Sequence, residues 1–163
     1  MAKFRYRMQS ILDIKMKLEN QAKQDFGAAK AALDLQIDKL EVLKQRKRGY
    51  ESEAERLLNG ELKIRNITDN KAAILRMDDY IRDQKEVVKK AEDKLEEARL
   101  KLQQVVQERK THEKLKEKAF DEFLEEEKRS EGKEVDQLTS YTYGQRKKGN
   151  SSVAEKKGED LNG

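Results

Sequence analysis

Apolar residues recur at every seventh position along the middle of the chain, and a second row follows the first by three positions. The first row consists of Ile67, Ile74, Ile81, Val88, Leu95 and Leu102. The second row consists of Asn70, Met77, Gln84, Ala91, Ala98, Val105, His112 and Ala119. These rows are the a and d positions of a heptad repeat, so they predict a left-handed coiled coil on a helix over about 68–136.

An earlier stretch, about 8–58, carries a less regular apolar stripe. Its members are spaced mostly by three or four residues: Phe4, Met8, Ile11, Leu18, Ala22, Phe26, Ala29, Leu33, Ile37 and Leu40. Lys15 interrupts the stripe between Ile11 and Leu18. Because the average spacing is close to about 3.6, the period of a straight helix, we expect this first helix to be only weakly supercoiled.

One break separates the two stripes. Asn59-Gly60 is a strong turn signal, and Asn66, Thr68 or Asp69 could each cap a new helix by accepting its free N–H groups. A single turn at about 59–67 between two apolar stripes predicts an all-α fold, a long antiparallel coiled-coil hairpin of two helices over residues 1–138.

The composition agrees with long helices rather than with a thick globular core. Charged residues make up 43% of the 163 residues, whereas a compact domain carries roughly a quarter. Proline is absent, so the predicted helices contain few breakers. Residues 139–163 contain few large apolar residues and many Gly, Ser and Lys, and we expect this tail to be disordered.

Folding the chain at the predicted turn sets the geometry of the hairpin. It places Ala28 and Ala29 opposite Ala98, where small side chains would allow close approach, although alanine is also simply the best helix former. At about 1.5 Å per residue, the second helix outruns the first by roughly 15 residues. The overhang contains three large apolar residues: Phe120, Phe123 and Leu124.

The candidate chemistry along the chain is sparse. His112 is the only histidine and there is no cysteine, whereas a zinc site needs three or four ligands. His112 lies on the d row, where a polar residue helps to fix the register of a coiled coil. A two-helix rod also offers no pocket that could desolvate acid–base groups. We therefore expect no catalytic residues, no metal, no cofactor and no enzyme activity.

The charges are mixed rather than strongly basic. The 37 basic and 33 acidic residues leave a net charge of +4. The densest basic cluster, residues 44–48, is followed at once by Glu51, Glu53 and Glu55, which favours a solvated helix face over nucleic-acid binding. No segment has the apolar run of a signal peptide or a membrane span. We therefore expect a cytoplasmic protein without membrane insertion.

Two tyrosines stand outside the apolar stripes. Tyr50 and Tyr80 each lie some 15 residues from the predicted turn, at about the same height on two antiparallel helices. We expect them to lie near each other, where they could anchor a partner or merely flank the seam.

Several stretches together resemble FliJ, the flagellar type III export protein. They are the opening KFRYRMQSILDIKMKLENQAKQDFGAA, the uninterrupted first helix, the restart near DDYIRDQ and the closing ERKTHEKLKEKAFDEFLEEEKRSEGKEVDQL. The aromatic residues Phe4 and Tyr6, followed by Met8 and Gln9, are among the most characteristic features. The resemblance covers roughly residues 3–138.

The resemblance implies a non-enzymatic coiled-coil stalk at the flagellar base, peripherally associated with the cytoplasmic membrane. Its terminal ends would enter the hexameric ring of the export ATPase, its hairpin surface would contact the cytoplasmic part of the export gate, and it would escort export chaperones. By position, the gate-facing residues are Leu43, Tyr50 and Tyr80. The candidate contacts at the ring end are Phe4, Tyr6, Phe120, Phe123 and Leu124.

Two positions depart from the family pattern. Arg46 stands where some relatives have another aromatic residue, and Asp136-Gln137 replaces an acidic pair. The rival interpretation is a generic coiled-coil scaffold that self-associates without an ATPase partner. A basic hairpin that binds nucleic acid is a third interpretation, which the mixed charge disfavours.

Overall fold

The computed structural model describes residues 2–159, which form two helices and no strand. Helix α1 covers Gln9–Leu58 and helix α2 covers Ile64–Glu159. The chain divides into two units. The hairpin unit is Ser10–Thr111, and the terminal unit is Met1–Gln9 with His112–Gly163.

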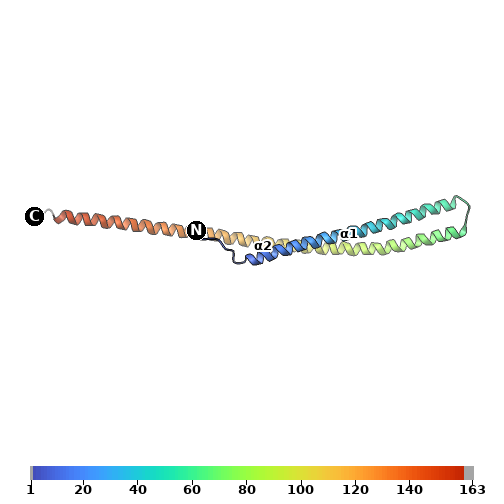
Figure 1. The fold of residues 1–163 in the computed structure, drawn as a ribbon, viewed down its shortest axis with the longest axis horizontal. Coiled ribbons are helices and arrows are strands. Elements are labelled where there is room, and N and C mark those ends of the chain that lie inside the picture. The colour runs from blue at the N-terminus through green and yellow to red at the C-terminus, as the bar shows by residue number, and fades with distance from the viewer. Residues whose placement is uncertain (1, 160–163) are drawn as a thin grey trace. The chain divides into compact units, whose positions relative to one another are not determined.

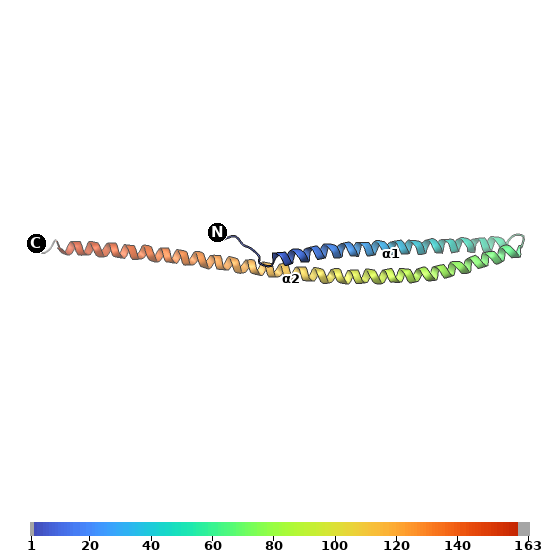
Figure 2. The same ribbon diagram turned by 60° about the horizontal axis from the view of Figure 1, so that its bottom comes forward.

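The hairpin unit confirms the predicted antiparallel pair of helices. Helix α1 leads to the turn, and the first part of α2 returns beside it (Figure 1). The second view shows the same two segments side by side (Figure 2). The unit therefore has the all-α hairpin fold that the two apolar stripes predicted.

The turn is shorter than the sequence predicted. The Asn59 N–H donates to the carbonyl oxygens of Glu55 and Arg56, at 3.2 and 3.3 Å, where α1 ends. Helix α2 then begins at Ile64, before the predicted start near residue 68. Thr68 does not cap this helix, because its Oγ1 donates to the Ile64 carbonyl oxygen at 2.9 Å from inside the first turn.

The seam of α2 lies where its heptads placed it. Within the hairpin unit, every a and d position from Ile67 to Val105 is buried or half-buried. Ile81 and Val105 are covered best, at 9% and 8% exposed. Burying a side chain of this kind contributes roughly 1.5–3 kcal/mol when it is fully removed from water, so a series of half-covered layers adds up to a stable contact.

The seam of α1 also repeats every seven residues, which the sequence did not predict. Its a row is Leu12, Glu19, Phe26, Leu33, Leu40, Lys47 and Ala54, and its d row is Lys15, Ala22, Ala29, Gln36, Leu43, Tyr50 and Leu57. All of them except Tyr50 are buried or half-buried. A strict seven-residue repeat is typical of left-handed supercoiling, and that this helix is only weakly supercoiled stays a prediction.

Two apolar residues that the sequence placed on this seam face away from α2. Leu18 is 46% exposed and Ile37 is 43% exposed, whereas the adjacent Glu19 and Gln36 turn toward the partner helix. The prediction failed there because it selected apolar side chains, and the seam holds polar ones. Polar seam residues are acceptable only where the other helix satisfies them.

Charged pairs join the two helices in the part of the seam that lies furthest from the turn. Lys15 Nζ lies 3.0 Å from Glu108 Oε2. Glu19, only 7% exposed, pairs with Arg109, which occupies the next a position of α2 after Leu102. Removing one partner of such a covered pair would leave an uncompensated charge, so these contacts favour one alignment of the helices.

Three further polar contacts join the helices nearer the turn. The Gln84 amide nitrogen donates to the backbone and side-chain oxygens of Gln36, both at 2.9 Å. Lys47 Nζ lies 2.6 Å from Asp78 Oδ1. Asn70 Nδ2 donates to the Tyr50 carbonyl oxygen at 3.0 Å.

The polar contacts follow a single antiparallel register. As the α1 residue changes from Lys15 to Tyr50, its partner on α2 changes from Glu108 to Asn70. A slip of one heptad would separate all these groups from their partners. Polar layers that match only in one alignment are a known means of fixing coiled-coil register.

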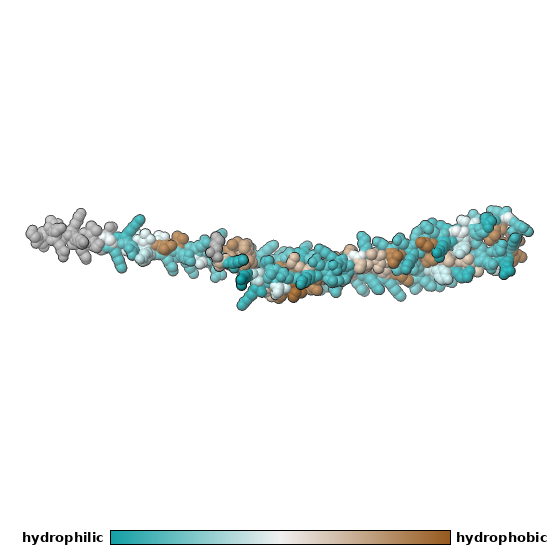
Figure 3. Space-filling model, in the orientation of Figure 1, coloured by the Kyte–Doolittle hydropathy of each residue, from teal (hydrophilic) through white to brown (hydrophobic). Residues whose placement is uncertain are grey.

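The core of the described residues is thin. Four apolar residues count as buried: Leu12, Ala22, Ile81 and Val105. On the visible face of the hairpin unit, apolar side chains form separate patches between charged ones rather than one continuous belt (Figure 3). These separate patches are the surfaces on which a partner could bind.

Helix α2 continues to Glu159, beyond the predicted end near residue 136. The segment that we expected to be a disordered tail, 139–163, is therefore helical up to residue 159, and residues 160–163 lie outside the described part. Side chains from 128 to 149 are all exposed. The absence of proline permits this helix, whose side chains over 128–149 are open to solvent.

Candidate partner-binding surfaces

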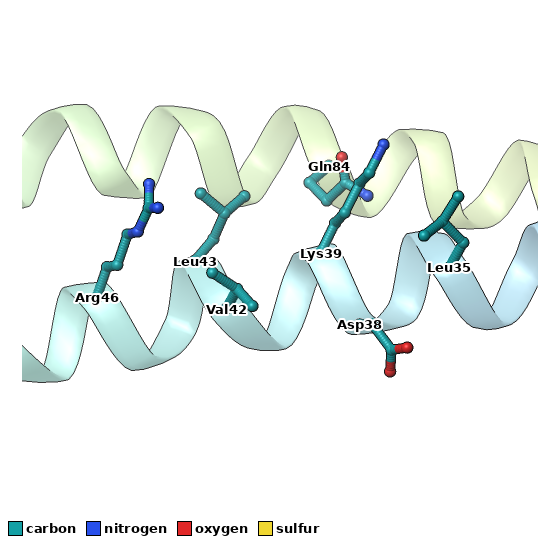
Figure 4. Close-up of a pocket in the computed structure, with 7 residues that line it drawn as sticks. All are labelled: Leu35, Asp38, Lys39, Val42, Leu43, Arg46 and Gln84. Atoms are coloured by element: carbon teal, nitrogen blue, oxygen red, sulfur yellow. The ribbon is translucent and has the colours of Figure 1, made fainter.

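Leu43 lies at the edge of the seam rather than free on the surface. It occupies a d position of α1, and its side chain points toward α2 (Figure 4). It lines an open groove of about 380 Å³ together with the exposed side chains of Leu35 and Val42. A partner that contacts Leu43 would therefore also contact this groove.

Tyr50 occupies the d position one heptad further along α1. It is 38% exposed, because the helices leave this seam position partly open. Its backbone carbonyl is already engaged by Asn70, but no ring contact covers its side chain among the described residues. The ring is therefore held by a fixed backbone and remains available to a partner.

Tyr80 is the most exposed of the three predicted gate-facing residues, at 52%. It follows the Asp78 that pairs with Lys47, and it lies ten residues beyond the Asn70 that binds Tyr50. Ten helical residues span about 15 Å. Tyr80 therefore lies closer to the level of Lys47 than to that of Tyr50, and that the two tyrosines are neighbours stays a prediction.

Electrostatics tie this region of the hairpin together. The hydrogen bond to the Asp78 carboxylate raises the pKa of the Lys47 ammonium above its ordinary value. Near the turn, the hydrogen bond from Arg56 lowers the pKa of the Glu53 carboxyl. Both pairs favour the charged forms, but only Lys47–Asp78 joins the two helices, so this one contact contributes to their alignment and is weakened by salt and by high pH.

The groove beside Leu43 is the feature that sequence reasoning missed. Leu35 and Val42 are 53% and 47% exposed and lie seven residues apart on α1. Ala28 continues the same row, so a second heptad row was present in the sequence but was not recognised. Ala29 and Ala91 line a neighbouring cavity, and the placement of Ala28 and Ala29 opposite Ala98 stays a prediction.

In the terminal unit, three aromatic rings predicted at the ring end pack against one another. The ring centroid of Phe4 lies 5.1 Å from that of Phe120 and 5.4 Å from that of Phe123. Phe120 and Phe123 are stacked at 6.5 Å. The non-helical residues 2–8 therefore pack against α2 through Phe4, and they cover part of the surface around Phe120 and Phe123.

The outward part of this cluster remains accessible. Phe120 and Leu124 are 42% and 43% exposed, whereas Phe4, Tyr6 and Phe123 are half-buried. Of the five residues predicted at the ring end, two thus present large apolar surface directly. That these residues contact a partner stays a prediction.

His112 occupies its predicted d position and is half-buried. Its Nδ1 atom is buried without a hydrogen-bond partner among the described residues. Over the same residues, no three His, Cys, Asp or Glu side chains gather closely enough to hold a metal ion. The described helices also contain no stretch that is long and apolar enough to cross a bilayer.

Comparison with known proteins agrees with this geometry. The sequence profile of the family described as Flagellar FliJ protein matches residues 4–148. The chain belongs to the FliJ family. A solved structure of a putative YscO homolog from Chlamydia trachomatis superposes on this FliJ-family chain with a TM-score of 0.72. The two are 22% identical, over 90% of this chain and 99% of that one, so the likeness shows a shared fold.

A search of curated proteins finds no match. Membership of the FliJ family makes the chain a component of the flagellar type III export apparatus. The family is one of non-enzymatic export components.

Proposed function

We propose that the chain is a stalk that couples the export ATPase ring to the export gate and escorts export chaperones. Family membership over residues 4–148 is the observation that carries this proposal. The partners are the hexameric export ATPase, the cytoplasmic part of the gate membrane protein and the chaperones. The stalk acts at the cytoplasmic face of the membrane at the flagellar base, without inserting into it.

The hairpin unit supports a mechanical role. Helix α1 has 50 residues and spans about 75 Å at roughly 1.5 Å per residue. Polar contacts at Lys15, Glu19, Gln36 and Lys47 hold α2 in one register. A body whose helices cannot slide past each other transmits a displacement or a torque applied at one end, because its two-helix contacts resist shear.

The gate contact is assigned to Leu43, Tyr50 and Tyr80. Tyr50 and Tyr80 are 38% and 52% exposed, and aromatic side chains on an exposed face are frequent anchors at interfaces. Leu43 supplies the apolar floor between α1 and α2 (Figure 4). The ring contact is assigned to the terminal unit, through Phe120 and Leu124 on α2 with Phe4, Tyr6 and Phe123 beside them.

The gate assignment is tested by Tyr50→Ala with Tyr80→Ala. We expect this double variant to bind the cytoplasmic part of the gate at least tenfold more weakly, with an unchanged helical circular-dichroism signal. Tyr141→Ala with Tyr143→Ala is the matched control, because these tyrosines are 68% and 70% exposed in the terminal unit. Equal gate affinity of both double variants would remove Tyr50 and Tyr80 as contacts.

The coupling role is tested by mixing the chain with the purified export ATPase. We expect faster ATP hydrolysis and more complete ring assembly, and we expect Phe120→Ser with Leu124→Ser to lose both effects. An unchanged rate and unchanged assembly would exclude the stalk.

The alternative is a generic scaffold that self-associates through its seam. Sedimentation of the purified chain separates the two functions. A monomer agrees with a closed hairpin, whereas a stable parallel dimer or trimer would support the scaffold.

A further inference from the structure

A long groove runs along one side of the hairpin unit. It consists of two cavities, one of about 280 Å³ and one of about 380 Å³. Gln36 lines the first and Gln84 lines the second. Because these two side chains are hydrogen-bonded at 2.9 Å, the cavities adjoin and form one surface.

The floor of the groove is apolar. Ala32, Leu35 and Val42 succeed one another on one side of α1, since helix neighbours lie three, four or seven residues apart. Val87 contributes from α2. Leu35, Val42 and Val87 are 53%, 47% and 41% exposed. Aliphatic side chains at this spacing form the kind of stripe that packs against another helix.

The rim of the groove is cationic. Lys39 and Arg46 line one cavity, and Lys90 and Lys94 line the other. Within the described residues, none of the four forms a salt bridge. Lys39 and Arg46 extend toward α2 across the groove, whereas Asp38, the one acidic residue on its lining, points away from α2 (Figure 4). The groove lining therefore carries four cationic side chains and one carboxylate, so its rim presents a net positive charge.

The length of the groove matches a helix of moderate size. Its lining on α1 runs from Ala29 to Arg46, which is about 25 Å at roughly 1.5 Å per residue. A segment of about 16–18 helical residues would cover it. A groove between two parallel-lying helices with apolar anchors at heptad spacing is a standard receptor for an amphipathic helix.

We propose that this groove binds an acidic amphipathic helix of a partner protein. The apolar face of that helix lies on Leu35, Val42 and Val87, and its flanking Glu or Asp side chains pair with Lys39, Arg46, Lys90 and Lys94. The complex is a local three-helix bundle. Complementary charge selects the partner and its orientation, and the apolar contacts supply affinity.

Charge disfavours a symmetric dimer that forms through this groove. In a symmetric dimer the same patch meets itself, so the cations of both grooves would face each other across the interface. Nucleic acid is disfavoured by the floor, because single strands bind on aromatic platforms and the groove offers aliphatic side chains. An acidic amphipathic helix matches both parts of the groove, because its carboxylates pair with the cationic rim and its apolar face packs on the aliphatic floor.

This inference shares Leu43 with the proposed gate contact and to that extent rests on it. It goes further by naming the chemistry of the bound segment and by extending the site away from the turn. The two can fail separately, because gate binding is measured with the gate protein and groove binding with a peptide.

The probe is a synthetic 18-residue peptide with leucines on one helical face and glutamates flanking them. A copy with lysine in place of every glutamate is the charge-reversed probe. We expect the acidic peptide to bind with micromolar affinity by fluorescence anisotropy, more weakly as salt rises, and the basic peptide to bind at least tenfold more weakly. Equal binding of both peptides would overturn the proposal.

Variants locate the site. Leu35→Ser with Val42→Ser should weaken acidic-peptide binding at least tenfold, and Lys39→Gln with Lys94→Gln should weaken it and flatten its salt dependence. Met16→Ser with Ile37→Ser is the matched control, because these residues are 46% and 43% exposed. Ile37 lies on the other side of α1, two residues and about 200° from Leu35.

Each variant is first checked for helicity and unfolding midpoint, so that a lost fold is not read as lost binding. Control and groove variants that bind alike would refute the groove. A chain that dimerises in sedimentation, and whose dimer is lost in the Leu35→Ser, Val42→Ser variant, would refute it in favour of self-association. If the chain binds the peptide but neither the ATPase nor the gate, the proposed function is wrong and the groove proposal is supported. If it binds the gate but not the peptide, the groove proposal is wrong and the proposed function is supported.

Discussion

The hairpin unit and the terminal unit are held together by different kinds of contact. In the hairpin unit, heptad layers on two helices pack along their whole length, and polar pairs such as Glu19–Arg109 and Gln36–Gln84 fix their alignment. In the terminal unit, α2 is fastened to residues 2–8 by the Phe4, Phe120 and Phe123 rings. Beyond residue 127, no described side chain up to 149 is covered.

The hairpin unit is therefore the more rigid of the two, and the terminal unit is the one whose apolar side chains are available to a partner. A unit with matched polar layers can serve as a fixed platform, and its partner-binding residues keep their spacing. A unit held by a few rings leaves apolar side chains such as Phe120 and Leu124 exposed, ready for a partner to cover. The proposed gate contact therefore lies on the stiff unit, and the proposed ring contact lies on the loosely held one.

Hydrogen exchange should show the largest contrast between the two units. We expect amides around Ile81 and Val105 to exchange only through global unfolding, because these seam residues are the best covered. Amides of 128–149 should exchange at least about a thousandfold faster, because an unpacked helix is marginal in water. Equal protection of the two regions would contradict the division into a stiff and a loose unit.

Breaking the Glu19–Arg109 pair should have the largest effect on stability. Arg109→Leu leaves Glu19, 7% exposed, without its partner on the other helix, and we expect a loss of about 3 kcal/mol of unfolding free energy. Urea unfolding followed by circular dichroism measures it. Replacing both residues by leucine should restore most of the loss, since the buried charge is then removed as well.

The control for this experiment is Arg82→Leu. Arg82 pairs with Asp79 on its own helix and is 70% exposed on its side chain, so its loss should change stability by no more than about 0.5 kcal/mol. If Arg109→Leu were as mild as this control, the polar layers would not fix the hairpin.

Much of this fold was predictable from the sequence. The seam of α2 was predicted more accurately than the seam of α1, and the residues on the two seams show why. The seam of α2 was located correctly from Ile67 to Val105, because nearly every position is apolar. The seam of α1 was misread at Glu19 and Gln36, because each polar residue there is satisfied by a residue distant in the sequence. A single helix carries no sign of such compensation.

The candidate surfaces were predictable only in part. The exposure of Tyr80 followed from its place outside the heptad rows. The packing of Phe4 on Phe120 and Phe123 could not be predicted from the sequence, because residues 2–8 are not helical and no helical periodicity indicates where their side chains lie. The groove was missed because its cations lie on α1 and α2, so its charge is visible only once both helices are aligned.

Phe4→Ala should loosen the terminal unit alone. The substitution removes two ring contacts, each worth about 1 kcal/mol, so amides near Phe120 should exchange faster. The urea midpoint of the hairpin unit should stay unchanged. Lys3→Ala, at an exposed neighbour, is the control and should alter neither measurement. A shifted midpoint in Phe4→Ala would show that the two units unfold together.

The smallest expected effects depend on pH. Asp78 raises the pKa of Lys47, so the contribution of Lys47 to stability is complete below its unfolded pKa, about 10.4, and is lost as pH rises through the higher folded value. Arg99 lowers the pKa of Glu96, so that contribution is present above about 4.3 and is lost as pH falls through the folded value.

Stability differences between the unsubstituted chain and two variants measure these contributions. The difference for Lys47→Met should shrink above pH of about 10.4, and the difference for Glu96→Gln should shrink below about 4.3. Differences that stay constant across both ranges would show that neither pair adds to folding.

The most direct test of the coupling role asks whether one chain holds both partners at once. The unsubstituted chain is mixed with the export ATPase and the cytoplasmic part of the gate, and the complexes are resolved by analytical ultracentrifugation. We predict a ternary complex that loses only the gate in Tyr50→Ala, Tyr80→Ala and only the ATPase in Phe120→Ser, Leu124→Ser. If the ATPase and the gate instead displace each other from the chain, it does not couple them.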